Sequence, residues 1–155
     1  MHLLAVGQRM PGWVQQGYGE YQQRIKGDFS LQLTEIPAAK RSKGATVTRM
    51  MDEEAARVLA ATPKGARLVA LDGRGRDWST EQLAEQLEHW SVDGRELAFA
   101  VGGPDGHGKA VLDACEARWS LSPLTFPHPL VRVLLAEQLY RALTILRGHP
   151  YHRAE

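Results

Sequence analysis

The sequence predicts an α/β protein with a mostly parallel sheet that carries helices on both faces. Short, continuously apolar segments alternate about five times with segments of helical period, which is the pattern of parallel strands joined by helical crossovers. No internal repeat, low-complexity segment or linker interrupts this alternation. With 155 residues, of which 43% are hydrophobic and 24% charged, the chain is long enough to bury one core of ordinary composition.

The first half of the chain supplies two predicted strands and two predicted helices. Residues 2–7 are a short apolar strand, and residues 13–26 have apolar side chains at helical spacing, although two glycines weaken this helix. Residues 29–36 alternate apolar and polar side chains, which is the period of a half-buried strand, and Pro37 ends it. Residues 46–61 place their apolar side chains on one broad helical face.

The second half of the chain continues the alternation. Residues 67–71 form a compact apolar strand, and the glycine-rich, charged segment 72–77 is expected to be a loop. Ser79 and Gln82 have the spacing of a capping box, which predicts a helix that runs to about Trp90. The remaining predicted elements are a strand over residues 96–101, a short helix over 109–117, a short strand over 118–121 and a helix over 130–146.

The segment 121–129 contains three prolines, which fix φ and remove three backbone donors. Because such a segment forms no ladder, its remaining N–H and C=O groups need water or a ligand as partners. The helix over 130–146 that follows is apolar on nearly all sides, with Pro129 suited to its first position, and is therefore expected to be buried. A rigid loop before a buried helix could hold a small molecule, and the alternative is a purely structural connection.

Glycine- or proline-rich loops follow three of the predicted strands, after Leu71, Val101 and Leu121. Ligands of parallel α/β sheets bind beyond the carboxyl ends of the strands, so these loops are the expected location of a site. Gly102 and Gly103 would let the backbone pass close to a ligand, or would simply make a tight turn. The chain has neither the complete glycine pattern of a dinucleotide-binding loop after its first strand nor a P-loop.

Charge and composition exclude several classes of protein. A net charge of +1 argues against a broad nucleic-acid-coating surface but permits a local basic patch. Lys40, Arg41 and Lys43 could form such a patch and hold phosphates, or could be a solvated loop. The single cysteine, Cys115, excludes an intramolecular disulfide and a cysteine-rich zinc site, and no histidine pair has zinc-enzyme spacing.

The location of the protein is predicted from the same features. The apolar runs are too short to cross a membrane, and the first residues resemble a strand more than a signal peptide. Together with the single cysteine, these features predict a cytoplasmic protein.

Several motifs taken together resemble the RlmH family of ribosomal large-subunit RNA pseudouridine N3-methyltransferases, minimal members of the SPOUT superfamily. The longest and most specific is LSPLTFPHPLVRVLLAEQLYR, over residues 121–141. The others are LDG at 71–73, VGGPDG at 101–106 and the terminal HPYHR at 149–153. Shorter matches at residues 5–7, 10–13, 20–21 and 36–41 extend the resemblance along the chain.

The resemblance implies one SPOUT methyltransferase domain over residues 1–155, of the alpha/beta knot type with a deep C-terminal trefoil knot. It also implies a homodimer that binds S-adenosyl-L-methionine, needs no metal and no membrane, and methylates N3 of a pseudouridine in 23S rRNA of the assembled ribosome. By the same resemblance the cofactor cleft is formed by Leu71, Gly102, Gly103, Leu121, Ser122, Pro123, Leu124, Thr125 and Phe126.

The chemistry of the implied reaction points to candidate catalytic residues. The imide nitrogen must lose a proton before it can attack the methyl group, so a proton acceptor is required. The candidates are His128, beside the cofactor loop, and His149 and His152 on the tail. Tyr151 and Arg153 are expected to hold the base and a phosphate, and the identity of the acceptor stays open.

Two other classes of function remain compatible with the residues. One is a ribosome-associated module that keeps the fold but binds no methyl donor. The other is a nucleotide-dependent oxidoreductase on a doubly wound sheet. The helix over 130–146 is apolar on more faces than a monomer surface allows, which agrees with the predicted homodimer.

Overall fold

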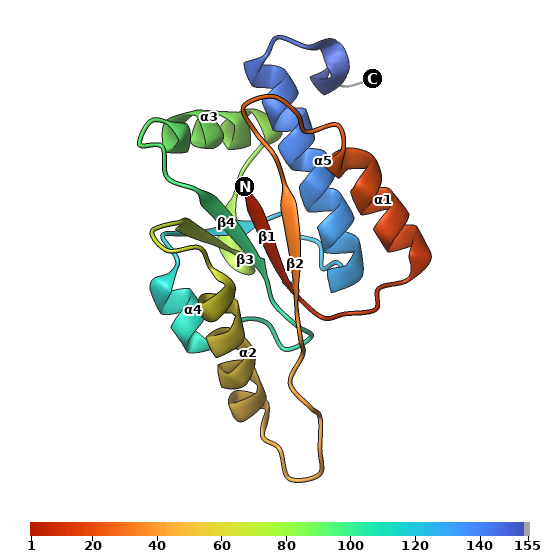
Figure 1. Ribbon diagram of the computed structural model, residues 1–155, viewed down its shortest axis with the longest axis vertical. Helices are drawn as coiled ribbons and strands as arrows, with labels where there is room; N and C mark the ends of the chain where they lie inside the picture. Colours follow the sequence, from red (N-terminus) through yellow and green to blue (C-terminus); the bar gives the residue numbers. More distant parts are fainter. Residues whose placement is uncertain (154–155) are drawn as a thin grey trace.

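The computed structural model describes residues 1–153, except for the side chain of His152. In this part of the chain five strands form one sheet in the order β2-β1-β4-β3-β5, and every neighbouring pair is parallel (Figure 1). This confirms the predicted fold class. The strands are β1 (His2–Val6), β2 (Gln32–Ile36), β3 (Arg67–Asp77), β4 (Leu97–Val101) and β5 (Ala117–Ser120).

Helices cover both faces of the sheet (Figure 1). One apolar cluster joins the sheet to α1, α3 and α5, and a second cluster joins the opposite face to α2 and α4. Each helix connects two parallel strands or follows the last one, as a parallel sheet requires. The helices are α1 (Gly12–Gln22), α2 (Val47–Ala61), α3 (Thr80–Ser91), α4 (Lys109–Ala114) and α5 (His128–Leu146), followed by a single 3-10 turn, η1 (Pro150–His152).

The strand β3 corrects the prediction that residues 72–77 form a loop. It continues to Asp77 through a bulge over residues 72–75, where the register shifts between Leu71 and Arg76. After the bulge, β3 pairs again with β5. Gly75 explains the continuation, because a Cβ at this position would lie 2.5 Å from the carbonyl carbon of Arg118 in β5. Only glycine allows this approach of the two backbones, so a residue that suggested a loop is required by the strand.

Four other boundaries differ from the prediction by a few residues. The helix α1 ends at Gln22 instead of residue 26, and β2 begins at Gln32 instead of residue 29. The helix α4 ends at Ala114, three residues early. The helix α5 begins at His128, because Pro129 is tolerated in a first helical turn. Ends of elements depend on caps and tertiary contacts, which periodicity does not report.

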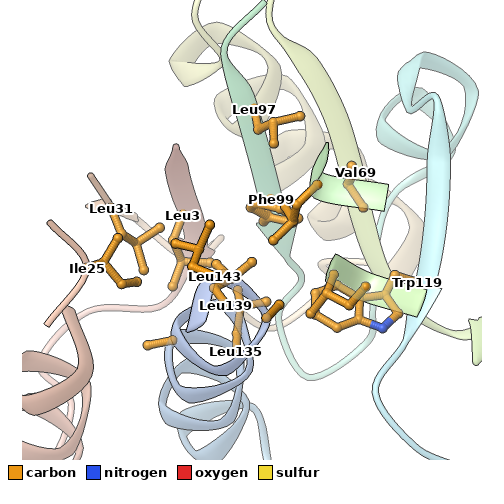
Figure 2. Packing of buried hydrophobic residues seen from close by; sticks show 14 of the residues in the cluster. Leu3, Ile25, Leu31, Val69, Leu97, Phe99, Trp119, Leu135, Leu139 and Leu143 are labelled. Atoms are coloured by element: carbon orange, nitrogen blue, oxygen red, sulfur yellow. The ribbon is translucent and has the colours of Figure 1, made fainter. Parts of the chain in front are cut away.

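The helix α5 is packed along the centre of the sheet. Leu135, Leu139 and Leu143 point from α5 toward Leu3 and Phe99 of the central strands (Figure 2). The burial of these leucines fixes the position of α5 and places its first turn beside the carboxyl ends of the strands. No helix in the described residues is long and apolar enough to span a membrane.

Candidate functional site

A cavity of about 270 Å³ lies at the carboxyl ends of β4 and β5 and beside residues 71–73 of β3, at the edge where ligands of parallel sheets bind. Three loops that are far apart in the sequence line it: the bulge of β3, the turn after β4 and the segment between β5 and α5. All of the positions predicted to hold the cofactor meet here: Leu71, Gly102, Gly103, Leu121, Ser122, Pro123, Leu124, Thr125 and Phe126.

The segment between β5 and α5 offers free backbone donors to this cavity. Its turn is closed by the Leu124 amide, which donates to Ser122 Oγ at 3.0 Å, and by Ser120 Oγ, which donates to the Ser122 carbonyl at 3.1 Å. Within residues 1–153, the amides of Ser122, Thr125 and Phe126 donate to no acceptor of the chain. These donors agree with the predicted need of this proline-rich segment for a ligand or water.

The turn after β4 has room for glycine alone at Gly102 and is tightly packed at Gly103. A Cβ at Gly102 would lie 2.8 Å from the carbonyl carbon of Gly106, and one at Gly103 would lie 3.0 Å from Glu54 Oε2. The Gly106 amide donates to the Gly103 carbonyl at 3.0 Å, and Gly106 itself has a φ of +85°. The segment is therefore a tight turn. Because its glycines have no side chains, the backbone of this turn itself forms part of the cavity wall.

His107 was not predicted as a site residue, yet it joins two walls of the cavity. Its ring is buried, and Nε2–H donates to the carbonyl of Leu71 at 3.1 Å. Burial lowers the pKa of His107 below its ordinary value, against the smaller opposing effect of this hydrogen bond. The imidazole is therefore neutral at pH 7 and acts as a fixed donor between the turn after β4 and the bulge of β3.

Arg132 is the second residue that the sequence analysis missed. Its side chain is only 2% exposed and bridges two neighbouring segments, with Nη1 2.7 Å from Glu35 Oε2 and Nη2 2.7 Å from the Gly7 carbonyl. The sequence feature that could have indicated this role is an arginine within an apolar helix, because a buried guanidinium requires an acidic or polar partner. Arg132 thereby fixes the loop after β1 beside the first turn of α5.

His128 is the only predicted catalytic residue among the described side chains that lines the cavity. It stands at the first position of α5, one helical turn before Arg132. Partial burial lowers its pKa, and the positive charge of Arg132 lowers it further. A neutral imidazole at pH 7 has a free ring nitrogen, so His128 has the protonation state that a proton acceptor needs.

Comparison with known proteins identifies the family. A sequence profile described as "Predicted SPOUT methyltransferase" matches residues 1–152, which is nearly the whole chain. The chain belongs to the SPOUT methyltransferase family. The fold expected of a SPOUT methyltransferase agrees with the parallel sheet and its flanking helices, whereas the threading of a knot stays a prediction.

Three relatives of this SPOUT methyltransferase are each named "Ribosomal RNA large subunit methyltransferase H", which confirms the resemblance to the RlmH family. The relative from Thioalkalivibrio sulfidiphilus is 56% identical over 99% of this chain and 98% of its own length. That from Alkalilimnicola ehrlichii is 58% identical over 99% of both chains. That from Hahella chejuensis is 55% identical over 97% of both chains.

The carboxyl-terminal tail of this SPOUT chain lies at the carboxyl end of α5 (Figure 1), whereas the cavity is lined by residues of the first turn of that helix. The helix has 19 residues, which makes it about 28 Å long. The ring of Tyr151 packs on Tyr140 near the far end of the helix, with ring centres 4.7 Å apart. In one chain, therefore, Tyr151, His149 and Arg153 are not brought together with the predicted cofactor residues, and the side chain of His152 lies outside the described residues.

The surroundings of Tyr151 keep its hydroxyl protonated. The hydroxyl donates to Glu137 Oε1 at 3.4 Å, and the guanidinium carbon of Arg141 lies 4.9 Å from the centre of the ring. Burial and the Glu137 carboxylate raise the pKa of Tyr151 to about 12, although Arg141 opposes this rise. Tyr151 is consequently a hydrogen-bond donor at pH 7 and a poor proton acceptor.

Metal ligands are not gathered anywhere in the described residues. No group of three or more histidine, cysteine, aspartate or glutamate side chains in residues 1–153, leaving out His152, is placed to hold a metal ion.

Proposed function

We propose that this chain is an S-adenosyl-L-methionine-dependent methyltransferase that methylates N3 of a pseudouridine in 23S rRNA of the assembled ribosome. The observation that carries the proposal is the meeting of three distant loops in one cavity, at the edge of the sheet where ligands bind. The SPOUT family match and the names of three near full-length relatives support the same activity. A trefoil knot and a cytoplasmic location belong to this proposal.

The residues present fit the proposed cofactor. The free amides of Ser122, Thr125 and Phe126 can donate to an adenine edge, and Leu71, Leu121 and Leu124 supply apolar walls to the same cavity. When bound, S-adenosyl-L-methionine would supply an already activated methyl group on a positively charged sulfur. The chain itself must then align the nucleophilic nitrogen with that methyl group and remove the proton from the nitrogen.

We assign removal of the N3 proton to His128. It lies on the cavity wall and is neutral at pH 7, because its pKa lies below the ordinary value. As the pH falls through this lowered pKa, the ring gains a proton and can no longer accept one. The rate of methyl transfer should therefore decline only at a pH below the ordinary pKa of histidine.

Replacing His128 by asparagine should lower the rate of methyl transfer roughly 100-fold or more and remove this acid limb. The measurement is single-turnover transfer of a labelled methyl group to ribosomes at saturating cofactor, across a series of pH values. His89→Asn, on the exposed side of α3, is the matched control and should keep the wild-type profile. An unchanged acid limb in His128→Asn would exclude His128 as the acceptor.

We further propose that the protein acts as a homodimer in which the tail of one protomer completes the cavity of the other. Two observations support this arrangement: the tail lies far from the cavity of its own chain, and Leu130, Val133 and Leu134 of α5 stay only half-buried in a single chain. Tyr151 and Arg153 would then hold the target base and its phosphate from the partner. Light scattering of the purified protein tests the dimer, and a monomeric mass would contradict it.

The proposed activity is tested by ligand binding and by product analysis. A raised melting temperature with S-adenosylhomocysteine but not with NAD is the expected result. Stabilisation by NAD alone would favour an oxidoreductase, and stabilisation by neither would favour a non-catalytic ribosome-associated module. Mass spectrometry of 23S rRNA from a strain without this protein should lack one methylated pseudouridine, and an unchanged set of modified nucleotides would contradict the proposed substrate.

A further inference from the structure

A second concave site lies on the opposite face of the sheet from α5, between α2 and the loop that precedes it. The loop over 37–46 extends away from the sheet beside the first turn of α2 (Figure 1). Together they enclose a cavity of about 360 Å³. We propose that this basic pocket binds a backbone phosphate of the RNA substrate; it is lined by Lys40, Ser42, Lys43, Gly44, Arg49 and Arg57, among others.

The charges of the basic pocket are unbalanced. Four cationic side chains line it against a single carboxylate, Glu53, and Glu53 already pairs with Arg57. In the described part of the chain the side chains of Lys40, Lys43 and Arg49 have no acidic partner. Three uncompensated cations around one hollow repel one another, so binding of an anion is electrostatically favourable.

The pocket is built by defined contacts at both ends of the loop. The Ala39 amide donates to the buried carboxylate of Glu54 at 2.9 Å, and Arg57 Nη1 donates to the Pro37 carbonyl at 2.7 Å. At the other end, Thr46 Oγ1 accepts from the amide of Arg49 and caps α2. The partial positive charge of the α2 amino terminus adds to the attraction for an anion.

The position of the basic pocket favours RNA over other anionic partners. Arg41 in the same loop forms an ion pair with Asp105, which lies in the turn after β4. Glu54, which holds Ala39, also lies against Gly103 of that turn. The loop that forms the pocket is therefore joined by two contacts to a wall of the proposed cofactor cavity, so one polynucleotide strand could occupy both.

This inference rests on the proposed function and revises the predicted phosphate contacts. The sequence grouped Lys40, Arg41 and Lys43 as candidate phosphate contacts. The ion pair with Asp105 assigns Arg41 to positioning the loop, while Arg49 and Arg57 enter the pocket from α2. The phosphate group is recognised by charge and not by base identity, so the pocket should favour no RNA sequence.

The test compares two triple variants of equal net charge. One replaces Lys40, Lys43 and Arg49 by glutamine, and the control replaces Lys26, Lys64 and Lys109, which line none of the described cavities. Binding of a labelled stem–loop RNA is measured by fluorescence anisotropy over a range of salt concentrations. The pocket variant should bind about tenfold more weakly or worse, with a salt dependence reduced by about one unit of slope for each lost contact.

Both triple variants should bind S-adenosylhomocysteine as the wild type does, because none of the changed residues lines the cofactor cavity. Equal loss of RNA binding in the two variants, or no RNA binding by the wild type, would overturn the inference. Displacement of the RNA by a polyglutamate peptide at equal charge concentration would identify an acidic protein as the partner and would also overturn it.

The result of this test can be distinguished from the result of the test of methyltransferase activity. If the pocket binds RNA but the protein transfers no methyl group to ribosomes, the phosphate site is supported and the proposed methyltransferase activity is contradicted. If the pocket variant transfers methyl groups at the wild-type rate when ribosomes are below saturation, the phosphate site is contradicted and the methyltransferase activity is supported.

Discussion

Replacing Gly102 by alanine is expected to abolish most of the affinity for S-adenosylhomocysteine. The added Cβ would lie 2.8 Å from the carbonyl carbon of Gly106 and 3.1 Å from the amide nitrogen of His107. These are backbone atoms, which cannot rotate away, so the turn must open. Overpacking of this kind typically costs about 1–3 kcal/mol, which corresponds to a roughly 5- to 150-fold rise in Kd if the cost falls on the bound state.

Opening of the turn would also disturb a second wall of the cavity. His107 follows Gly106 directly and donates to Leu71, so a shift of the turn moves the donor that holds the bulge of β3. Isothermal titration calorimetry measures the affinity, and circular dichroism verifies that the variant is folded. A folded Gly102→Ala variant with wild-type affinity would show that the turn is not part of the cofactor site.

The matched control for this variant is Gly19→Ala in α1. A Cβ at Gly19 meets no atom within 4 Å, and the position is helical. The change should therefore raise the free energy of unfolding by up to about 1 kcal/mol, because alanine is the better helix former. Affinity for S-adenosylhomocysteine should not change.

Replacing Arg132 by methionine is expected to destabilise the protein strongly. Methionine keeps much of the side-chain volume but leaves the Gly7 carbonyl and the Glu35 carboxylate without their donor. Because the Glu35 side chain is 38% exposed and can regain water, the cost should be lower than for a fully buried pair. We expect the free energy of unfolding to fall by about 2–4 kcal/mol.

The same substitution should change the pH dependence of catalysis. Arg132 contributes to the lowered pKa of His128, after the larger effect of burial. Loss of the positive charge raises the pKa of His128, so the acid limb of methyl transfer should move to higher pH. Urea unfolding at constant m value and a pH–rate profile measure the two effects, and an unmoved acid limb would contradict the electrostatic role of Arg132.

The control for Arg132 is Arg24→Met. Arg24 lies just after the end of α1, where it forms a largely exposed ion pair with Glu20. Its guanidinium carbon also lies 5.6–6.0 Å from the ring centres of Tyr21, Tyr140 and Tyr151, contacts that contribute little at an exposed site. Water screens and replaces such a pair, so the unfolding midpoint should stay close to that of the wild type. If Arg24→Met also lowers the free energy of unfolding strongly, the destabilisation by Arg132→Met reflects the loss of a positive charge in general and not the contacts of Arg132.

Rules that concern single residues or turns predicted the structure correctly wherever one residue or one turn determines the backbone conformation. Ser79 and Gln82 were predicted to cap a helix, and both bonds of the capping box are present at 3.1 and 2.9 Å. The loops after the fourth and fifth strands were predicted from glycine and proline, whose constraints belong to the residues themselves. These loops meet in one cavity because parallel strands present their carboxyl ends at the same edge.

The same rules failed where distant residues decide the structure. Gly75 suggested a loop, but the backbone of Arg118 lies against it and makes it part of a strand. The role of Arg132 depends on partners 97 and 125 positions away in the sequence, and that of His107 on a partner 36 positions away. No window of sequence contains both members of such a pair.

Periodicity and short motifs are local properties of the chain, so they were enough to predict the class of fold, the order of its elements and the resemblance to the SPOUT methyltransferase family. Three features became visible only in the folded chain: Arg41 pairs with Asp105, Arg132 holds the loop after β1, and Tyr151 lies at the far end of α5 from the cavity. These facts depend on which surfaces are buried together, since an ion or a polar group loses water on burial and takes whatever partner the fold brings to it.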